Sequence, residues 1–407
     1  MILTPEEQHM LDSGGAVAAA LREQMLVGEF FGARGFVEIS NAHFTGDPEV
    51  FGTAGREYLE ELVEGRGRCR IPTTRNAICV DLESMDELAQ STHLAEEELL
   101  VRKLLASLGA MAVNTCIGYQ TVYQPQRGEH VAWGDTGTVA YANAVLGART
   151  NYEAGSASLL AGITGRTPAY GFHLDENRAA RYLVEVDAEL TDPAHWGAVG
   201  ALVGQRYRGY DNVAAIRVPA GSAPDTDDLK HLAAAIASYG SMAMFHVVGV
   251  TPEAPTLEEA TRGNPLLAAS SLSAAELDAF LEPGAGEAPS VTVFTAPQLS
   301  LFEVARIDQL MLGRRVADGT TMILTTNRMV GEEAERLGYA ERLRAAGVKI
   351  IHDTCWYLMD PASQREEFGW STLTTNSAKL ANIVRAHGYQ PSIRTTEDCI
   401  VISTEEI

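Results

Sequence analysis

Short apolar runs alternate with helical patterns in the C-terminal part of the chain. The runs SVTVF, TTMIL and VKII are rich in β-branched and apolar residues, and each is followed by a polar turn. The first two turns lead into helical patterns at 301–312 and 328–347. This alternation predicts an α/β protein with mostly parallel strands.

A further helix is predicted upstream. Leucines recur at helical spacing over 94–108, Gly109 provides a stop, and the short run AMAV then leads to NTC at 114–116. Similar polar endings follow the later apolar runs, as TAPQ at 295–298, TTN at 325–327 and HDTC at 352–355. Ligands bind beyond the carboxyl ends of strands in open parallel sheets. Cys116 and Cys355 are therefore expected where a sheet presents ligands.

The Pro-Gly-Ala-Gly sequence at 283–286 predicts the main domain boundary. Residues 1–285 are expected to form N-terminal and central α/β lobes, and residues 286–407 a C-terminal α/β lobe. The first segment carries Cys116 and the motifs at 127–178, and the second carries Cys355 and Cys399.

Composition and charge indicate where the protein is located and which kinds of partner it binds. Hydrophobic residues make up 46% of the chain, but no apolar stretch approaches the roughly 18–20 residues of a membrane span. The acidic, polar start MILTPEEQHMLDSGG is unlike a signal peptide, so we expect a cytoplasmic protein without membrane contact. The net charge of −23 repels nucleic acids and anionic membranes, which leaves a small molecule or another protein as the partner.

The five cysteines are widely spaced and form no C-x-x-C pair, so neither structural disulfides nor a zinc ribbon is expected. Cys116, Cys355 and Cys399 come from separate segments. Three such thiols suit a four-iron cluster that leaves one iron open as a Lewis acid. On spacing alone, ordinary buried cysteines are the alternative.

The densest polar stretch, at 127–151, holds candidates for acid–base chemistry and substrate binding. Asp135 stands at the start of a predicted helix, where it either caps the helix or takes part in chemistry. Glu129 and His130 are not explained as caps. Arg149, which is followed by a threonine and an asparagine, fits the bidentate clamp that a substrate carboxylate needs.

Two further segments contain ionisable side chains. His173, in YGFHLDENR, has an aspartate two residues away and could bind metal, with a hydrogen-bonded structural histidine as the simpler alternative. Lys379, in TTNSAK, could anchor a carboxylate or act as a base if its pKa is lowered, with an exposed lysine as the alternative. No G-x-S-x-G elbow, Walker loop or H-E-x-x-H motif is present, which disfavours a serine hydrolase, a P-loop enzyme and a zincin.

Several longer motifs together resemble a known family. NTC, EHVAWGDTGTVAYANAVLGARTN, ITGRTPAYGFHLDENR, DTC and TTNSAK are similar to the large subunit of the aconitase X family, and the similarity extends over nearly the whole chain. The resemblance implies a three-lobed α/β large subunit of an iron–sulfur hydro-lyase, with mostly parallel sheets and with the swivel domain on a separate small subunit. The chain departs from the family at the bulky Trp356 and Tyr357 and in having NSAK where NSGK is commoner, and both changes would reshape the pocket.

The resemblance also implies roles for particular residues. The implied cluster ligands are Cys116, Cys355 and Cys399, whereas Cys69 and Cys79 are packing residues. The implied catalytic residues are Glu129, His130, Asp135, His173 and Lys379. The implied substrate-binding residues are Arg149, Thr150, Asn151 and Ser377. A four-iron cluster is expected, with a two-iron or mononuclear iron site as alternatives.

Two activities are known in this family. The segment GYQTVYQPQRGEHVAWGDTG resembles the enzymes that dehydrate cis-3-hydroxy-L-proline to Δ1-pyrroline-2-carboxylate more than those that dehydrate mevalonate 5-phosphate. In the superfamily a serine of the swivel lobe acts as the base, so we expect this chain to need its small subunit for activity. A non-catalytic paralogue without a cluster, in which the three cysteines only pack, is the alternative from another functional class.

Overall fold

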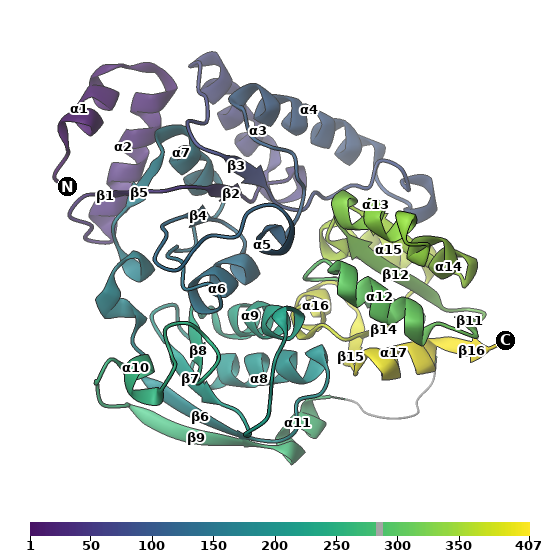
Figure 1. Cartoon of the computed structure of the whole chain (residues 1–407). Coiled ribbons are helices and arrows are strands. Elements are labelled where there is room, and N and C mark those ends of the chain that lie inside the picture. Colours follow the sequence, from purple (N-terminus) through teal and green to yellow (C-terminus); the bar gives the residue numbers. More distant parts are fainter. Residues whose placement is uncertain (282–287) are drawn as a thin grey trace.

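The computed structural model describes residues 1–281 and 288–407, which form three lobes, each with its own parallel sheet. Figure 1 shows the first lobe (purple to teal) above the second (teal to green), with the third (green to yellow) beside them. The predicted α/β architecture with mostly parallel strands is confirmed. The expected boundary at 285 lies outside the described residues.

The first lobe is built around a three-stranded parallel sheet. Its elements are α1 (Pro5–Asp12), α2 (Gly15–Phe30), β1 (Phe36–Glu38), β2 (Ala42–Phe44), α3 (Pro48–Glu64), β3 (Thr73–Arg75), α4 (Thr92–Leu108), α5 (Gly118–Thr121), β4 (Ala132–Trp133), α6 (Thr136–Ala144), α7 (Ser156–Thr164) and β5 (Arg166–Pro168). The strand order is β3-β2-β4, and β1 pairs with β5 separately. The helix predicted from leucine spacing is α4, which ends at Gly109 in the left-handed conformation (φ +84) that favours glycine.

The second lobe has a four-stranded parallel sheet in the order β8-β7-β6-β9. Its elements are β6 (Tyr182–Asp187), α8 (Pro193–Arg206), β7 (Ala214–Arg217), α9 (Thr226–Gly240), β8 (Phe245–Val247), α10 (Leu257–Thr261), β9 (Ala268–Ser273) and α11 (Ala274–Phe280). Helices α8 and α9 pack closely, because Gly204 and Gly240 bring the two backbones together. Helix α9 also contacts α6 of the first lobe, so it lies at the centre of the molecule.

The third lobe has a five-stranded parallel sheet in the order β13-β12-β10-β14-β15. Its elements are β10 (Val291–Phe294), α12 (Leu301–Leu310), β11 (Arg314–Val316), β12 (Thr321–Thr326), α13 (Arg328–Arg336), α14 (Tyr339–Ala345), β13 (Val348–His352), α15 (Pro361–Phe368), β14 (Thr372–Thr375), α16 (Ala378–Val384), β15 (Gln390–Ile393), α17 (Thr396–Ser403) and β16 (Thr404–Glu406). The predicted helix at 328–347 is divided into α13 and α14, because Gly338 takes a left-handed conformation (φ +76). The chain order reverses between β10 and β14, and such a switch point opens a crevice for ligands.

Buried apolar clusters divide the cysteines. The largest cluster draws on all three lobes and contains Cys116 and Cys355. Another cluster, within the third lobe, contains Cys399 packed with Phe294 and Ile400. Within the described ranges, no helix is both long and apolar enough to cross a membrane.

Candidate functional site

Two buried thiols meet where the first and third lobes join, and we call Cys116 and Cys355 the thiol pair. Cys116 follows Met111, which bridges to the edge of the first sheet, and Cys355 follows the end of β13. Their Sγ atoms are 3.8 Å apart, and the residues are 5% and 2% exposed. Both positions lie at the carboxyl edges of parallel sheets, where the polar strand endings predicted a ligand site.

The backbone turns sharply two residues before each thiol. Asn114 has φ +46 and Asp353 has φ +64, values that are uncommon for residues other than glycine. The Asn114 Nδ2 donates to Asp353 Oδ2 over 3.4 Å, so the two turns contact each other. Residues in this conformation persist only where the surroundings hold them, and they are concentrated at functional sites.

A buried cation and a buried carboxylate lie beside the thiol pair. Lys379, in the first turn of α16, places Nζ 3.5 Å from Asp135 Oδ1 and 5.8 Å from the ring centre of Tyr357. Burial pushes the pKa of Lys379 down, but the Asp135 carboxylate and the two thiols outweigh it and raise the pKa overall. Asp135 also caps α6, because its Oδ2 accepts a hydrogen bond from the Thr138 N–H.

Hydrogen bonding between the two thiols separates their pKa values. The bond raises the pKa of Cys116, and burial adds to this. It lowers the pKa of Cys355, against the effect of burial, and the Thr295 hydroxyl 3.8 Å from Cys355 Sγ lowers it further.

The separation of the thiol pair matches shared ligation of one metal ion. Two sulfurs that each lie about 2.3 Å from a tetrahedral ion are about 3.8 Å apart, the distance observed here. Among the residues that the structure describes, no group of three or more His, Cys, Asp and Glu side chains could hold a metal ion. The described part of the chain therefore offers two thiol ligands at this point.

Cys399 does not join the thiol pair, contrary to the ligand set expected from the sequence. It lies in α17, four residues after the N-cap Thr395, and its Sγ is 3.8 Å from the Arg394 carbonyl oxygen. The first turn of α17 directs this thiol into the core of its own lobe, beside Phe294. The three-cysteine arrangement is therefore not formed.

Four predicted residues form a second polar group: Glu129, His130, Arg149 and His173. The Nδ1 atoms of His130 and His173 are 2.8 Å apart, so one ring donates to the other. Arg149 Nη1 donates to the His173 carbonyl over 3.0 Å, and its Nη2 forms an ion pair with Asp175. The Glu129 carboxylate accepts from a tyrosine hydroxyl.

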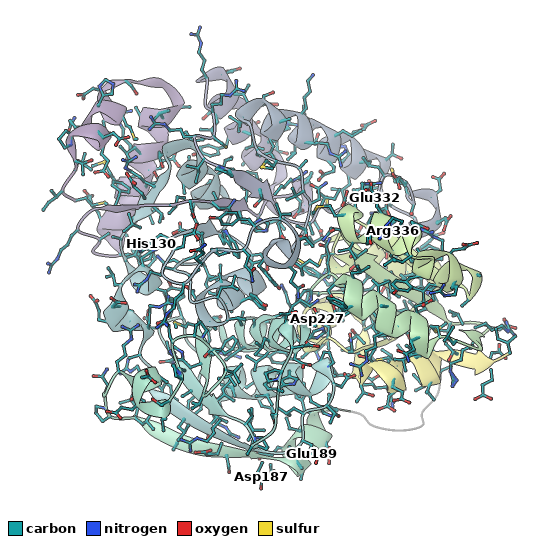
Figure 2. The ribbon with its side chains drawn as sticks, viewed as in Figure 1. His130, Asp187, Glu189, Asp227, Glu332 and Arg336 are labelled. Atoms are coloured by element: carbon teal, nitrogen blue, oxygen red, sulfur yellow. The ribbon has the colours of Figure 1, made fainter. Side chains whose placement is uncertain are left out.

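Strand β4 separates this second group from the thiol pair. His130 precedes β4 and Asp135 follows it, and five residues of extended chain span roughly 16 Å. Figure 2 shows His130 in the first lobe, away from the third, whereas Asp227 lies at the junction with the third lobe. Burial lowers the pKa of His130 to about 4, and the positive charges of Arg149 and Arg178 add to the effect while Asp175 opposes it. Residues that are close in sequence thus lie at the two ends of one strand.

Three predicted substrate-binding side chains are engaged by the protein itself. Thr150 Oγ1 donates to the Asn151 carbonyl over 2.9 Å, and Asn151 Oδ1 accepts from the Phe172 N–H over 2.9 Å. Ser377 Oγ donates to the Ala296 carbonyl over 2.5 Å and caps α16. All three side chains are at most 1% exposed, so their observed role is to hold the backbone.

Two contacts of the thiol pair were not assigned to the site from the sequence. The Gln298 N–H lies 3.2 Å from Cys116 Sγ, and Thr295 approaches Cys355. Both belong to the TAPQ turn at the carboxyl end of β10, so the available signal was their position after a strand. Cys69 packs against a different cluster of the first lobe. Cys79 lies in the same buried cluster as the thiol pair, where its Sγ is 3.8 Å from Glu98 Oε2.

Fold and site define a three-lobed α/β protein with a thiol pair buried where two lobes meet. The chain belongs to the aconitase X family: the family's first, second and third domains match residues 1–176, 180–282 and 289–405. The resemblance seen in the sequence and the expected three-lobed fold are confirmed. The crystal structure of Thermococcus kodakaraensis aconitase X in its holo-form superposes with a TM-score of 0.86 at 30% identity, covering 98% of this chain and 99% of that one.

The relatives carry two names. The phosphomevalonate dehydratase large subunit of Methanothermobacter thermautotrophicus is 34% identical over 93% of this chain and 92% of its own length. The cis-3-hydroxy-L-proline dehydratase of Pseudomonas aeruginosa is 35% identical over 91% of this chain, which spans only 64% of that relative. Both names denote dehydratases, so the predicted enzyme class, a hydro-lyase, is confirmed.

Proposed function

We propose that this chain is the large subunit of a dehydratase that acts with a separate small subunit on cis-3-hydroxy-L-proline. The observation that carries the proposal is the buried Lys379–Asp135 pair beside the thiol pair. It offers one positive and one negative group within 3.5 Å of each other. The amino-acid substrate carries the same two charges, as a carboxylate and a secondary ammonium.

In this proposal the pair binds both ends of the zwitterion. The Lys379 ammonium holds the substrate carboxylate, and the Asp135 carboxylate accepts from the substrate ammonium. Tyr357 packs over Lys379 and restricts the position of its ammonium. The proton on the carbon next to the hydroxyl is removed by a base of the small subunit, and Glu129, His130 and His173 are not needed for this step because they lie beyond β4.

The family relationship suggests an iron–sulfur group, and the thiol pair supplies two ligands for it. When bound, such a group supplies a Lewis acid that assists loss of the hydroxyl. Cys116 and Cys355 would hold it, and Cys399 would not. Two protein thiols suit a mononuclear or two-iron site better than the expected three-cysteine, four-iron cluster.

A phosphorylated substrate matches these charges less well. A phosphate monoester adds a charge of about −1.5 to −2 at neutral pH, and a carboxylate adds another. Near the thiol pair, the positive charge of Arg328 is already paired with Glu83 and Asp353. Phosphomevalonate is nevertheless the second candidate, because its dehydratase is the name found more often among the relatives.

The test is turnover of both compounds by the chain combined with its small subunit, prepared without oxygen. We expect water loss from cis-3-hydroxy-L-proline, no turnover of phosphomevalonate, and no activity of the chain alone.

Lys379→Met should lower kcat/KM about 10- to 100-fold through loss of a charged hydrogen bond. The matched control is Lys349→Met at the surface lysine of β13. If only phosphomevalonate were turned over, it would take the place of cis-3-hydroxy-L-proline as the proposed substrate. Full activity of the isolated chain would contradict the two-subunit proposal.

A further inference from the structure

Gln298 connects the two loops that carry the thiol pair. It is completely buried. Its main-chain N–H donates to Cys116 Sγ over 3.2 Å, and its side-chain Oε1 accepts from the Cys116 N–H over 3.3 Å. Two hydrogen bonds in opposite directions thus fix Cys116 against this one residue.

The amide nitrogen of the same side chain reaches both loops. Gln298 Nε2 donates to the Asn114 carbonyl over 3.3 Å and to the Thr354 carbonyl over 2.9 Å. Asn114 precedes Cys116 by two residues in the first lobe, and Thr354 directly precedes Cys355 in the third. Both donors and the acceptor of the amide are therefore used to join two lobes at the thiol pair. Losing such bonds in a buried site leaves carbonyl groups without partners.

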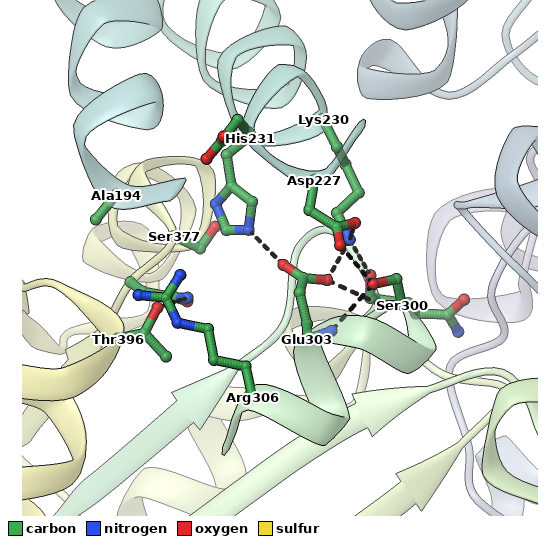
Figure 3. Close-up of polar contacts among 12 residues, drawn as sticks. Ala194, Asp227, Lys230, His231, Ser300, Glu303, Arg306, Ser377 and Thr396 are labelled. Atoms are coloured by element: carbon green, nitrogen blue, oxygen red, sulfur yellow. Dashed lines mark hydrogen bonds and ion pairs between the residues drawn. The ribbon is translucent and has the colours of Figure 1, made fainter. Parts of the chain in front are cut away.

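The second lobe in turn holds Gln298. Lys230, which is completely buried, donates from Nζ to the Gln298 carbonyl over 3.3 Å. It pairs with Asp227 at 3.0 Å and with Glu303, and Ser300 Oγ donates to Asp227 over 2.6 Å. Figure 3 shows this network between α9 and the start of α12. The turn that carries Gln298 is thereby anchored to α9.

We propose that Gln298 is a positioning residue that sets the separation of the Cys116 and Cys355 thiols. Four hydrogen bonds place it against both cysteine loops, beside the direct bond from Asn114 to Asp353 that also links them. The part that concerns metal binding rests on the proposed function, and the part that concerns the thiols themselves does not.

Two measurements on the full-length, metal-free chain test this role. The first is the rate at which diamide joins Cys116 to Cys355, followed by peptide mass mapping; the two thiols lose two protons and two electrons, and diamide becomes the hydrazine. The second is titration with Co²⁺ alone, read by its thiolate charge-transfer absorption. In Gln298→Leu we expect both the disulfide rate and the Co²⁺ affinity to fall about 10- to 100-fold.

The matched control is Gln24→Leu in α2. Gln24 is another buried amide, which donates to the Arg166 carbonyl over 2.6 Å and accepts from Thr164 over 2.9 Å, away from the thiols. It should lower stability while leaving both thiol measurements unchanged. Should Gln298→Leu fail to fold, Gln298→Glu keeps the volume and the acceptor but loses donors, and a smaller decrease in both measurements is expected.

The outcomes separate the two proposals. Wild-type rates in both Gln298 variants, or equal decreases in Gln24→Leu, would overturn the positioning role. A wild-type chain that does not bind Co²⁺ would count against the thiol pair as a metal site, while the disulfide rates would still decide whether Gln298 positions the thiols.

Discussion

At the scale of single residues, the structure distinguishes cysteines that the sequence treats alike. Cys116, Cys355 and Cys399 are all buried, but only the first two share a contact. Cys399 is surrounded by third-lobe side chains such as Phe294. Burial raises the pKa of Cys399 well above the ordinary value, and the pKa of Cys116 is raised as well, so what sets Cys399 apart is its position in the third-lobe core.

We therefore predict that Cys399→Ser retains the metal whereas Cys116→Ser and Cys355→Ser lose it. Iron per chain after anaerobic purification provides the measurement. Cys399→Ser should cost stability only through the polar group it places in a core. Loss of iron in Cys399→Ser at unchanged stability would restore the three-cysteine ligand set.

A second residue-scale prediction concerns His246, which is 1% exposed and bonds through Nε2 to the Arg178 carbonyl over 2.8 Å. Burial lowers its pKa from 6.5 to about 4, although Glu253 acts in the opposite direction. Between these values the unfolded chain binds a proton that the folded chain does not, so stability falls as pH falls from about 6.5 to 4, by at most about 1.4 kcal/mol per pH unit. Urea denaturation at pH 7, 6 and 5 should show that the free energy of unfolding falls less steeply with pH in His246→Gln than in the wild type. Equal slopes in the two proteins would contradict this.

At the scale of elements, the packing of α8 against α9 depends on glycine. A Cβ at Gly204 would lie 2.9 Å from the backbone nitrogen of Gly240 and from the Ile236 carbonyl oxygen. A Cβ at Gly197, in the same helix, would meet Ala378 Cβ at an ordinary 3.5 Å. The two glycines have the same helical propensity and differ only in what they face.

Gly204→Ala should accordingly lower the free energy of unfolding by about 1–3 kcal/mol through overpacking. Gly197→Ala should be neutral or stabilise by up to about 1 kcal/mol, because alanine is the better helix former. Urea denaturation of the two variants measures the contrast. Equal effects would mean that α8 and α9 can separate without cost.

At the scale of the whole molecule, the lobes are joined by buried polar groups as well as by apolar packing. Lys230 of the second lobe lies between Asp227 of its own helix and Glu303 of the third lobe. Gln120 of the first lobe donates to Asp227 over 2.9 Å, so all three lobes meet in this network. Removing one member of a buried ion pair leaves the other charge uncompensated.

Lys230→Met should therefore destabilise the chain by about 3–5 kcal/mol. Lys349→Met, at a partly exposed lysine, should change stability by less than about 1 kcal/mol. Thermal or urea denaturation compares the two variants. A small effect of Lys230→Met would show that the apolar contacts alone hold the lobes together.

Much of this protein follows from its sequence. Apolar runs ending in polar turns predicted β10, β12 and β13 and the parallel sheet they form, because strand and helix periodicities are local properties. The same endings placed Cys116 and Cys355 at carboxyl edges of sheets. Long motifs were sufficient to identify the family from the sequence.

Only the tertiary structure decided which of these residues meet. His130 and Asp135 are five positions apart, yet they lie at the two ends of β4, because an extended chain separates residues along its length. Cys116 and Cys355 are 239 positions apart, yet their sulfurs lie in contact. The sequence by itself determined the elements and the family; the packing of three lobes around α9 determined the thiol pair, its Gln298 connection and the exclusion of Cys399, since contacts between distant segments exist only once the lobes have packed.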